Sequence, residues 1–226
     1  MPTDRTKKTF VGFGFGAIQS GLFLFEAYES GNFSRFVVAE VDDAVVKAVR
    51  ANGGRYRVNV ARKDRIDHFE LSGIELLNPG DTSDRERIVT AVTESDEMAT
   101  ALPSVNFYDA GDAAPARLVA AGLARRKTPL PTVIYAAENH NHAAEILSEA
   151  VARHMPSGGF EGIEPLNTVI GKMSGVITDP RVIAEMRLDT VTPDLPRAIL
   201  VEEFNRILVS RVHLPGYRRG IEVFVE

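Results

Sequence analysis

The chain has 226 residues, of which 44% are hydrophobic and 25% are charged, a composition typical of a folded globular protein. The formal net charge is −5 and the sequence has no lysine or arginine block, so we expect no general attraction to nucleic acid or to an anionic membrane. Cysteine is absent, which excludes disulfide bonds, thiolate zinc sites and a cysteine nucleophile.

The amino-terminal segment MPTDRTKKTF lacks the apolar region of a signal peptide. No apolar run approaches the roughly 20 residues of a membrane span. We therefore expect a cytoplasmic protein without a membrane partner. A chain of this length can bury one large core or two modest ones, and we expect a single domain over residues 1–226.

Residues 9–25, TFVGFGFGAIQSGLFLF, are the most informative stretch. A short apolar run enters a turn with alternating glycines at Gly12, Gly14 and Gly16, and apolar residues at helical spacing follow. Glycine is needed there because the turn requires backbone angles that other residues avoid, and because a side chain would hold the backbone away from a bound pyrophosphate. The free N–H groups of the following helix would then face the anion.

Two registers of the dinucleotide-binding fingerprint fit these glycines. Gly12, Gly14 and Ala17 satisfy the pattern G-x-G-x-x-G/A, whereas a register that starts at Gly14 places Gln19 where the third glycine should be. The registers differ in which backbone N–H groups would meet the phosphates. The alternative to a cofactor site is a glycine-rich turn that only joins a buried strand to a buried helix.

A strand-like run at residues 35–39 ends in Glu40, about twenty residues beyond the glycines. A dinucleotide site places a carboxylate at this position to accept hydrogen bonds from the adenosine ribose hydroxyls. The strand, the glycine turn, the helix start and Glu40 together predict an NAD-binding Rossmann half.

The rest of the chain alternates between helical and strand-like patterns. Helices are predicted at residues 42–51, 83–94, 113–126 and 141–154. Strands of the parallel pattern are predicted at residues 98–102 and 131–137. A meander inserted between the two Rossmann halves, rather than further parallel strands, is predicted from residues 56–61, 66–71 and 74–77.

The last third of the chain lies outside this βαβ pattern. Strand-like segments occur at residues 167–177, 198–203 and 220–225. Residues 181–188 fit either a helix or a strand. The predicted fold class is α/β, Rossmann-like and doubly wound, with a mostly parallel sheet, a small β insertion and extra carboxyl-terminal strands.

A polar cluster, Glu138-Asn-His-Asn-His142, follows the last strand of the parallel pattern. Ligands of open α/β sheets bind at the carboxyl ends of strands, so this cluster lies where chemistry is expected. We expect no metal ion there, because its two histidines are two residues apart and no further Asp, Glu or His completes a set at helical spacing. The structural alternative is that Asn139 or Asn141 caps the following helix and that the histidines are exposed.

Four motifs extend in order over almost the whole chain. They are Phe13-Gly-Phe-Gly-Ala-Ile-Gln-Ser-Gly21, Val38-Ala-Glu-Val-Asp42, Ala136-Ala-Glu-Asn139 and Asn167-Thr-Val-Ile-Gly-Lys-Met173. Together they resemble the amino-terminal domain of the mannitol dehydrogenase family, the polyol-specific long-chain dehydrogenases. The resemblance implies NAD as cofactor, a polyol or sugar phosphate as substrate, and the register in which Gly14 and Gly16 contact the pyrophosphate.

The resemblance also implies roles for individual residues. Glu40 matches the acidic residue that binds the adenosine ribose, which implies a preference for NAD over NADP. Asn139 matches the asparagine whose amide helps to hold the substrate oxygen as negative charge develops on it. The residues that the resemblance implies as cofactor contacts are Gly14, Phe15, Gly16, Ala17, Ile18, Gln19, Glu40, Val41, Thr100, Ala101, Leu102, Glu138 and Asn139.

Departures from the family pattern leave two functions open. The family usually has Asp-Arg where this chain has Gly171 and Lys172, so a carboxylate near the nicotinamide is missing. The general base of the family is a lysine on a carboxyl-terminal helical domain, and we expect this chain to end before it. The chain is therefore expected to be the NAD-binding domain of a polyol or sugar-phosphate dehydrogenase or, alternatively, a non-catalytic NAD(H)-binding module.

Overall fold

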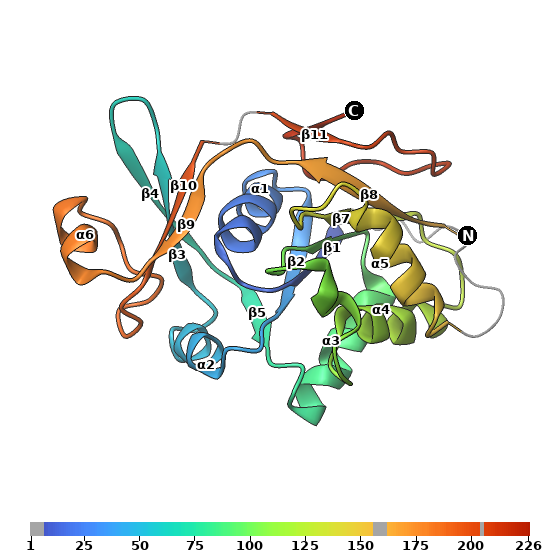
Figure 1. Cartoon of the computed structure of the whole chain (residues 1–226). Helices are drawn as coiled ribbons and strands as arrows, with labels where there is room; N and C mark the ends of the chain where they lie inside the picture. Colours follow the sequence, from blue (N-terminus) through green and yellow to red (C-terminus); the bar gives the residue numbers. More distant parts are fainter. Residues whose placement is uncertain (1–6, 156–161, 204–205) are drawn as a thin grey trace.

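The computed structural model describes residues 7–155, 162–203 and 206–226, and these residues form two sheets (Figure 1). The main sheet has eight strands in the order β12-β11-β8-β7-β6-β1-β2-β5, and the second sheet has four in the order β4-β3-β10-β9. From β8 to β5 every neighbouring pair is parallel. This is the 3-2-1-4-5-6 order of a doubly wound dinucleotide-binding fold, so the predicted fold class is confirmed.

The six parallel strands bring their carboxyl ends to one edge of the sheet. They are β1 (Lys8–Phe13), β2 (Phe33–Ala39), β5 (Ile74–Leu77), β6 (Glu97–Thr100), β7 (Thr132–Ala136) and β8 (Ile163–Val169). Every residue of β6 and β7 is buried, as is β1 apart from its first residue. Strands covered on both faces are usually continuous apolar runs rather than alternating ones; β7 (TVIYA) is mostly apolar, whereas β6 (EMAT) has buried polar residues at both ends.

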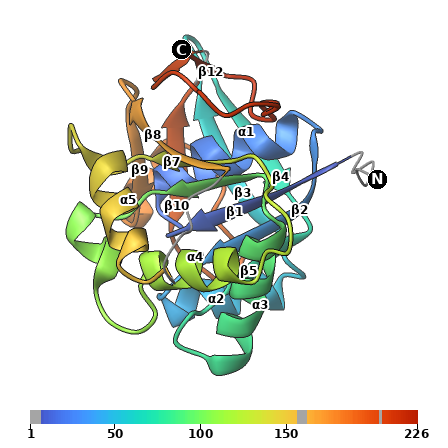
Figure 2. The same cartoon turned by 90° about the vertical axis from the view of Figure 1, so that its right-hand side faces the viewer.

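Helices cover both faces of the main sheet (Figures 1 and 2). One face packs against the π-helix η1 (Gln19–Phe23), α1 (Leu24–Glu29) and α2 (Asp43–Ala51). The other face packs against α3 (Thr82–Glu94), α4 (Pro115–Ala124) and α5 (Ala143–Ala152). The helix starts that follow β1 and β2 therefore lie beside the carboxyl edge of the sheet.

The second sheet lies on the helix that follows the glycine turn. It consists of β3 (Tyr56–Ala61), β4 (Ile66–Leu71), β9 (Ser174–Ile177) and β10 (Ala198–Glu202). The Tyr56 hydroxyl donates to the Ser20 carbonyl at 2.7 Å. A Cβ atom at Gly21 would lie 2.4 Å from Val201 Cγ1, so glycine at that position allows the helix and β10 to approach each other closely.

The meander predicted for residues 56–77 is wrong. Its first two strands form an antiparallel hairpin, β3 and β4, in the second sheet, but its third is β5, which pairs in parallel with β2 in the main sheet. The strand expected at residues 98–102 ends at Thr100, where β6 ends. The first difference arises because the alternation of a short strand predicts its exposed face but not the strand with which it pairs.

The carboxyl-terminal third also differs from the expectation in detail. The segment 167–177 is two strands, because the chain leaves the main sheet after β8 and enters the second sheet at β9. Residues 181–188 contain a helix, α6 (Pro180–Glu185). The strand expected at 220–225 is reduced to β12 (Phe224–Val225), which pairs in parallel with β11 (Ile207–Val209).

Residues 1–6, on which part of the signal-peptide expectation rests, lie outside the described residues. Within the described ranges, none of the helices combines the length and the apolar character that crossing a bilayer requires.

Candidate functional site

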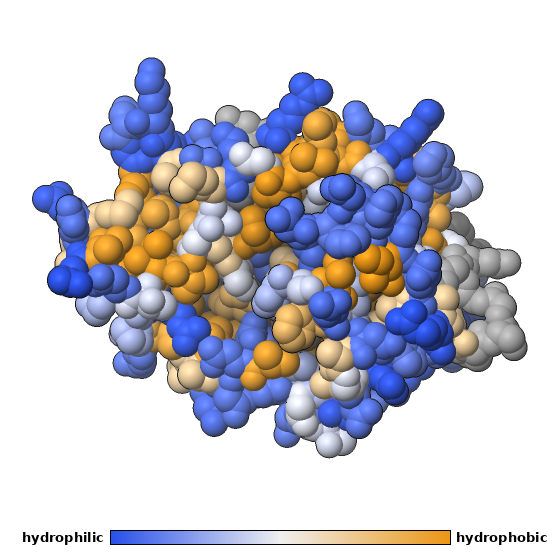
Figure 3. Space-filling model, viewed as in Figure 1, coloured by the Kyte–Doolittle hydropathy of each residue, from blue (hydrophilic) through white to orange (hydrophobic). Residues whose placement is uncertain are grey.

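A cavity of about 630 Å³ opens at the carboxyl edge of the main sheet, beside the ends of β1, β2, β6 and β7. Its volume falls within the roughly 300–1,000 Å³ that is usual for cofactor pockets. Its lining residues are 13–18, 39–41, 79, 101–103, 107, 110, 113–115, 137 and 174–176. Most of their side chains are apolar, and Glu40 carries the negative charge of the lining. Figure 3, which is viewed from the same side as Figure 1, shows hydrophobic surface in the region of α6 and β9.

The glycine turn forms part of the cavity wall. Gly14 has a φ of +89°, and its N–H donates to the Ala39 carbonyl at 2.8 Å. A Cβ atom at Gly14 would lie 2.8 Å from the Ala101 carbonyl oxygen, so both the backbone angle and the available space require glycine. A Cβ atom at Gly16 would meet no atom within 4 Å, which leaves the backbone open to a ligand in the cavity.

A helix begins directly at this open glycine. The Gly16 carbonyl accepts hydrogen bonds from the Ser20 N–H at 2.9 Å and from its hydroxyl at 2.7 Å. The first N–H groups of a helix have no acceptor within the helix, and here they belong to residues that line the cavity. The turn therefore fits a pyrophosphate group: it has no obstructing side chain, and its helix N-terminus favours an anion.

Gln19 does not line the cavity, although it belongs to the predicted cofactor contacts. The side chain is fully buried beneath the glycine turn and packs against Gly12. Neither atom of its amide group finds a hydrogen-bond partner in the part of the chain that the structure describes. Gly12 likewise is absent from the lining, whereas Gly14 and Gly16 are both present, the pair that the second register of the fingerprint selects.

Glu40 lies at the end of β2, directly after Ala39, whose carbonyl accepts from the Gly14 N–H, and it also lines the cavity. Its Oε1 accepts from the Asp42 N–H at 2.7 Å, a bond that fixes the carboxylate at the cavity. Val41, between them, is 74% exposed and also lines the cavity. The position fits the expected hydrogen bonds to a ribose.

Asp42 joins this part of the cavity wall to the second sheet. Its Oδ1 caps α2 by accepting from the Ala44 N–H at 3.0 Å, and its Oδ2 pairs with Nη1 of Arg197 at 3.0 Å. Partial burial raises the pKa of Asp42, but the hydrogen bonds from Arg197 and Ala44 outweigh this effect and the pKa lies below its ordinary value. Sequence reasoning missed Arg197, because it is 155 residues from Asp42 along the chain.

Thr100 and Glu138 lie behind the cavity wall, whereas Ala101 and Leu102 lie on it. The buried Glu138 carboxylate accepts hydrogen bonds from the Thr100 hydroxyl at 2.9 Å, from the Leu102 N–H at 2.8 Å and from the Tyr108 hydroxyl. Burial, followed by the charge of Glu138, raises the pKa of Tyr108. The carboxylate thus fixes the segment after β6 that forms the wall.

Asn139 is exposed in the turn after β7 and does not line the cavity. The capping alternative is wrong: α5 begins at Ala143, and the N–H of Ala144 donates to Oδ1 of Asn167 at 2.9 Å, so a residue of β8 caps this helix. His140 is exposed, as the sequence suggested. Within the described ranges, no group of three His, Asp or Glu side chains is placed to hold a metal ion.

Gly171 and Lys172 lie exposed in the connection between β8 and β9. The strand that follows them supplies the remaining wall of the cavity through Ser174, Gly175 and Val176. Sequence reasoning missed this wall because it treated the whole segment as one strand. The break between β8 and β9 is what carries the chain across to the second sheet and over the cavity.

Comparison with known proteins supports the fold. No family model and no curated protein matches the sequence. The solved structure of octopine dehydrogenase with NADH and pyruvate is similar, with a TM-score of 0.54, 10% sequence identity and coverage of 89% of this chain. The match covers 42% of the octopine dehydrogenase chain, so the present chain spans less than half of that protein's length. The chain therefore has the Rossmann-like α/β fold that a dehydrogenase of known structure also contains.

Proposed function

We propose that this chain is the NAD(H)-binding domain of a dehydrogenase that acts on a secondary alcohol of a polyol or sugar phosphate, as the mannitol-1-phosphate 5-dehydrogenases do. The observation that carries the proposal is that an unobstructed glycine turn and Glu40 line the same cavity. Bound NAD would supply the hydride chemistry, and the chain would bind and orient it. Residues 1–226 would form this domain.

The cavity offers a distinct environment to each part of the cofactor. The amides that follow Gly14 would bind the pyrophosphate, and Glu40 would accept from the adenosine ribose. Leu102 and Phe107 provide apolar surface for the adenine, and Phe107 is half exposed, so its ring is accessible. Thr100, Gln19 and Glu138 would support these contacts from behind the wall rather than touch the cofactor.

The substrate would lie near the carboxyl end of β7. Asn139 is exposed there and its side chain is not engaged in capping α5, so its amide is available to a substrate oxygen. The polyol assignment rests on the four motifs in register, including the one that contains Asn139. A second candidate, an NAD(H)-binding module without catalysis, is favoured by Gly171 and Lys172, which place no carboxylate after β8.

The decisive test of cofactor binding is Gly16→Val, titrated with NADH and followed by fluorescence or calorimetry. The new side chain projects into open space, so the protein should fold, but it occupies the place of the pyrophosphate. Gly171→Val is the matched control, because a Cβ atom there also meets no atom within 4 Å and Gly171 does not line the cavity. We expect NADH binding by the wild type and the control and at least a tenfold weaker affinity for Gly16→Val. Equal affinity in all three would contradict the proposal.

A screen of polyols and sugar phosphates for NAD reduction separates the two candidate functions. Turnover by a protein that contains this domain supports the dehydrogenase. NADH binding without turnover on any polyol, by the protein at its natural length, supports the non-catalytic module.

A further inference from the structure

Asp42 occupies a position from which it can control cofactor choice. It follows Glu40 and Val41, both of which line the cavity, and its N–H holds the Glu40 carboxylate. A dinucleotide with a 2′-phosphate would bring additional negative charge to this part of the cavity, where binding sites specific for NADP place an arginine. Glu40 would repel such a phosphate, whereas the negative charge of Asp42 is paired with Arg197.

Arg197 is a cation that contacts Asp42, next to the lining residues Glu40 and Val41, although it does not itself line the cavity. It directly precedes β10 of the second sheet, and its partly exposed guanidinium donates to Asp42 through Nη1 at 3.0 Å. A guanidinium is planar and has five N–H donors, a geometry that suits phosphate oxygens. In this structure Asp42 neutralises it and fixes its direction.

We infer that Asp42 is a specificity-determining positioning residue, which keeps Arg197 away from the ribose 2′ position and so makes the site select NAD(H) against NADP(H). The inference rests on the proposed cofactor function. It differs from an assignment to Glu40 alone, because it predicts that the protein already contains a phosphate-binding arginine and that one carboxylate withholds it.

The experiment compares NADH and NADPH affinities of the full chain by fluorescence titration. In Asp42→Asn the charge is lost but the cap of α2 is retained, because Asn and Asp cap helices about equally well. Asp43→Asn is the matched control: it removes an equal charge one residue away, from a carboxylate that contacts Lys47 and Asn78 instead of Arg197. Asp42→Asn combined with Arg197→Met tests whether the guanidinium is responsible.

We expect Asp42→Asn to bind NADPH about tenfold more tightly than the wild type, with NADH affinity within about twofold. The gain should be absent in Asp43→Asn and should disappear when Arg197→Met is added. An unchanged ratio of affinities in Asp42→Asn overturns the inference, and so does a gain that survives Arg197→Met. Asp42→Ser, which also retains a capping side chain, replaces Asp42→Asn should that variant fail to fold.

These outcomes are distinct from failure of the proposed function. If the folded wild type binds neither NADH nor NADPH, the cofactor assignment and the inference fall together. If the wild type binds NADH and loses that binding in Gly16→Val, but Asp42→Asn leaves the ratio unchanged, only the inference falls.

Discussion

The side-chain amide of Gln19 fills the space into which a side chain at Gly12 would project. A Cβ atom at Gly12 would lie 2.1 Å from Nε2 and 2.8 Å from Cδ of Gln19. In the dinucleotide-binding fingerprint a third glycine on the helix allows close packing of helix and strand. Here the helix carries Gln19 at that position and the strand carries Gly12, so the strand rather than the helix leaves the space for close packing. The departure at Gln19 is therefore compatible with the fold.

Gly12→Ala should lower the free energy of unfolding by about 1–3 kcal/mol, because the added methyl group overpacks a fully buried contact. In the background of Gln19→Ala the same change should cost less than half as much, since the amide that it strikes is gone. Urea unfolding of the four members of this double-mutant cycle measures the coupling. Equal costs of Gly12→Ala in both backgrounds would show that the two residues do not compete for one space.

The parts of the fold and the site that could be predicted from the sequence are those whose signals come from residues close together in the chain. The glycine turn and Glu40 are each defined by residues close together in the chain, and the structure places both on one cavity. Asp42 illustrates the limit: an aspartate before a helical pattern is a local capping signal, which Asp42 shares with Asp43, whereas its partner Arg197 lies 155 residues away. The pairing of β5 with β2 was missed for the same reason, since strand partners are chosen by tertiary packing.

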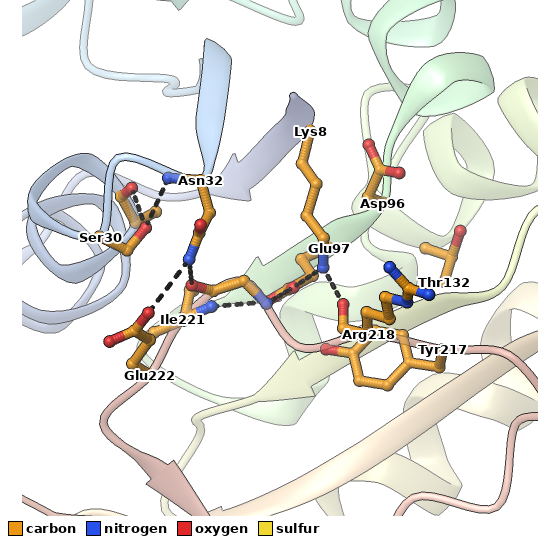
Figure 4. A network of polar contacts seen from close by, with 12 residues as sticks. Lys8, Ser30, Asn32, Asp96, Glu97, Thr132, Tyr217, Arg218, Ile221 and Glu222 are labelled. Atoms are coloured by element: carbon orange, nitrogen blue, oxygen red, sulfur yellow. Dashed lines mark hydrogen bonds and ion pairs between the residues drawn. The ribbon is translucent and has the colours of Figure 1, made fainter. Parts of the chain in front are cut away.

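A buried carboxylate, Glu97, anchors the carboxyl-terminal segment to the start of β6 (Figure 4). It accepts from Lys8 Nζ at 2.7 Å, from the Tyr135 hydroxyl at 3.1 Å, from the Ile221 N–H at 3.4 Å and from the Gly220 N–H. A Cβ atom at Gly220 would lie 2.9 Å from Oε1 of the same carboxylate, so the segment can approach only with glycine there.

Glu97→Gln should destabilise the protein by roughly 2–4 kcal/mol. It leaves Lys8 without its charged partner, and it replaces one carboxylate oxygen, which accepts hydrogen bonds from backbone N–H groups, with an NH₂ group that cannot accept them. Residues 217–226 should at the same time become more sensitive to proteolysis. Glu185→Gln, at an exposed position of α6, is the control and should change stability by less than about 0.5 kcal/mol. A similar small effect of Glu97→Gln would mean that the carboxylate charge does not anchor the segment.

Glu26 predicts a dependence of stability on pH. It faces a cavity of about 260 Å³ between α1 and the second sheet, whose lining includes Phe25 and Phe69. Burial, and then the charge of Glu29, raises the pKa of Glu26 from 4.5 to about 7. The folded state therefore binds more protons than the unfolded state between these values, and the free energy of unfolding falls as the pH rises through this window.

Glu26→Gln should remove this contribution and stabilise the protein at pH 8 by roughly 1–2 kcal/mol, a figure reduced for the partial exposure of the side chain. Urea unfolding at pH values from 4.5 to 8 measures the slope. Glu149→Gln, at an exposed position of α5, should leave the slope unchanged. A slope that persists in Glu26→Gln would assign the pH dependence to another group.

Asn139 and Asn167 allow structure and catalysis to be separated. Asn167→Ala should cost about 1 kcal/mol of stability, because its Oδ1 caps α5 through the Ala144 N–H and its Nδ2 donates to Glu145 at 2.9 Å. Asn139→Ala should change stability by less than about 0.5 kcal/mol, since the residue is exposed and does not cap the helix.

In a dehydrogenase that contains this domain, Asn139→Ala should lower kcat by on the order of 10²-fold and leave NADH affinity nearly unchanged, because its amide would stabilise the substrate oxygen more in the transition state than in the ground state. Asn141→Ala is the matched control, an exposed asparagine two residues further along the same turn, and should retain turnover. Thermal midpoint, kcat and NADH affinity measured on the same preparations distinguish the roles. A loss of stability in Asn139→Ala with unchanged turnover per folded molecule would reverse the assignment, and a different residue would then donate to the substrate oxygen. His140, exposed after β7, and Lys172, exposed after β8, would be the next residues to replace.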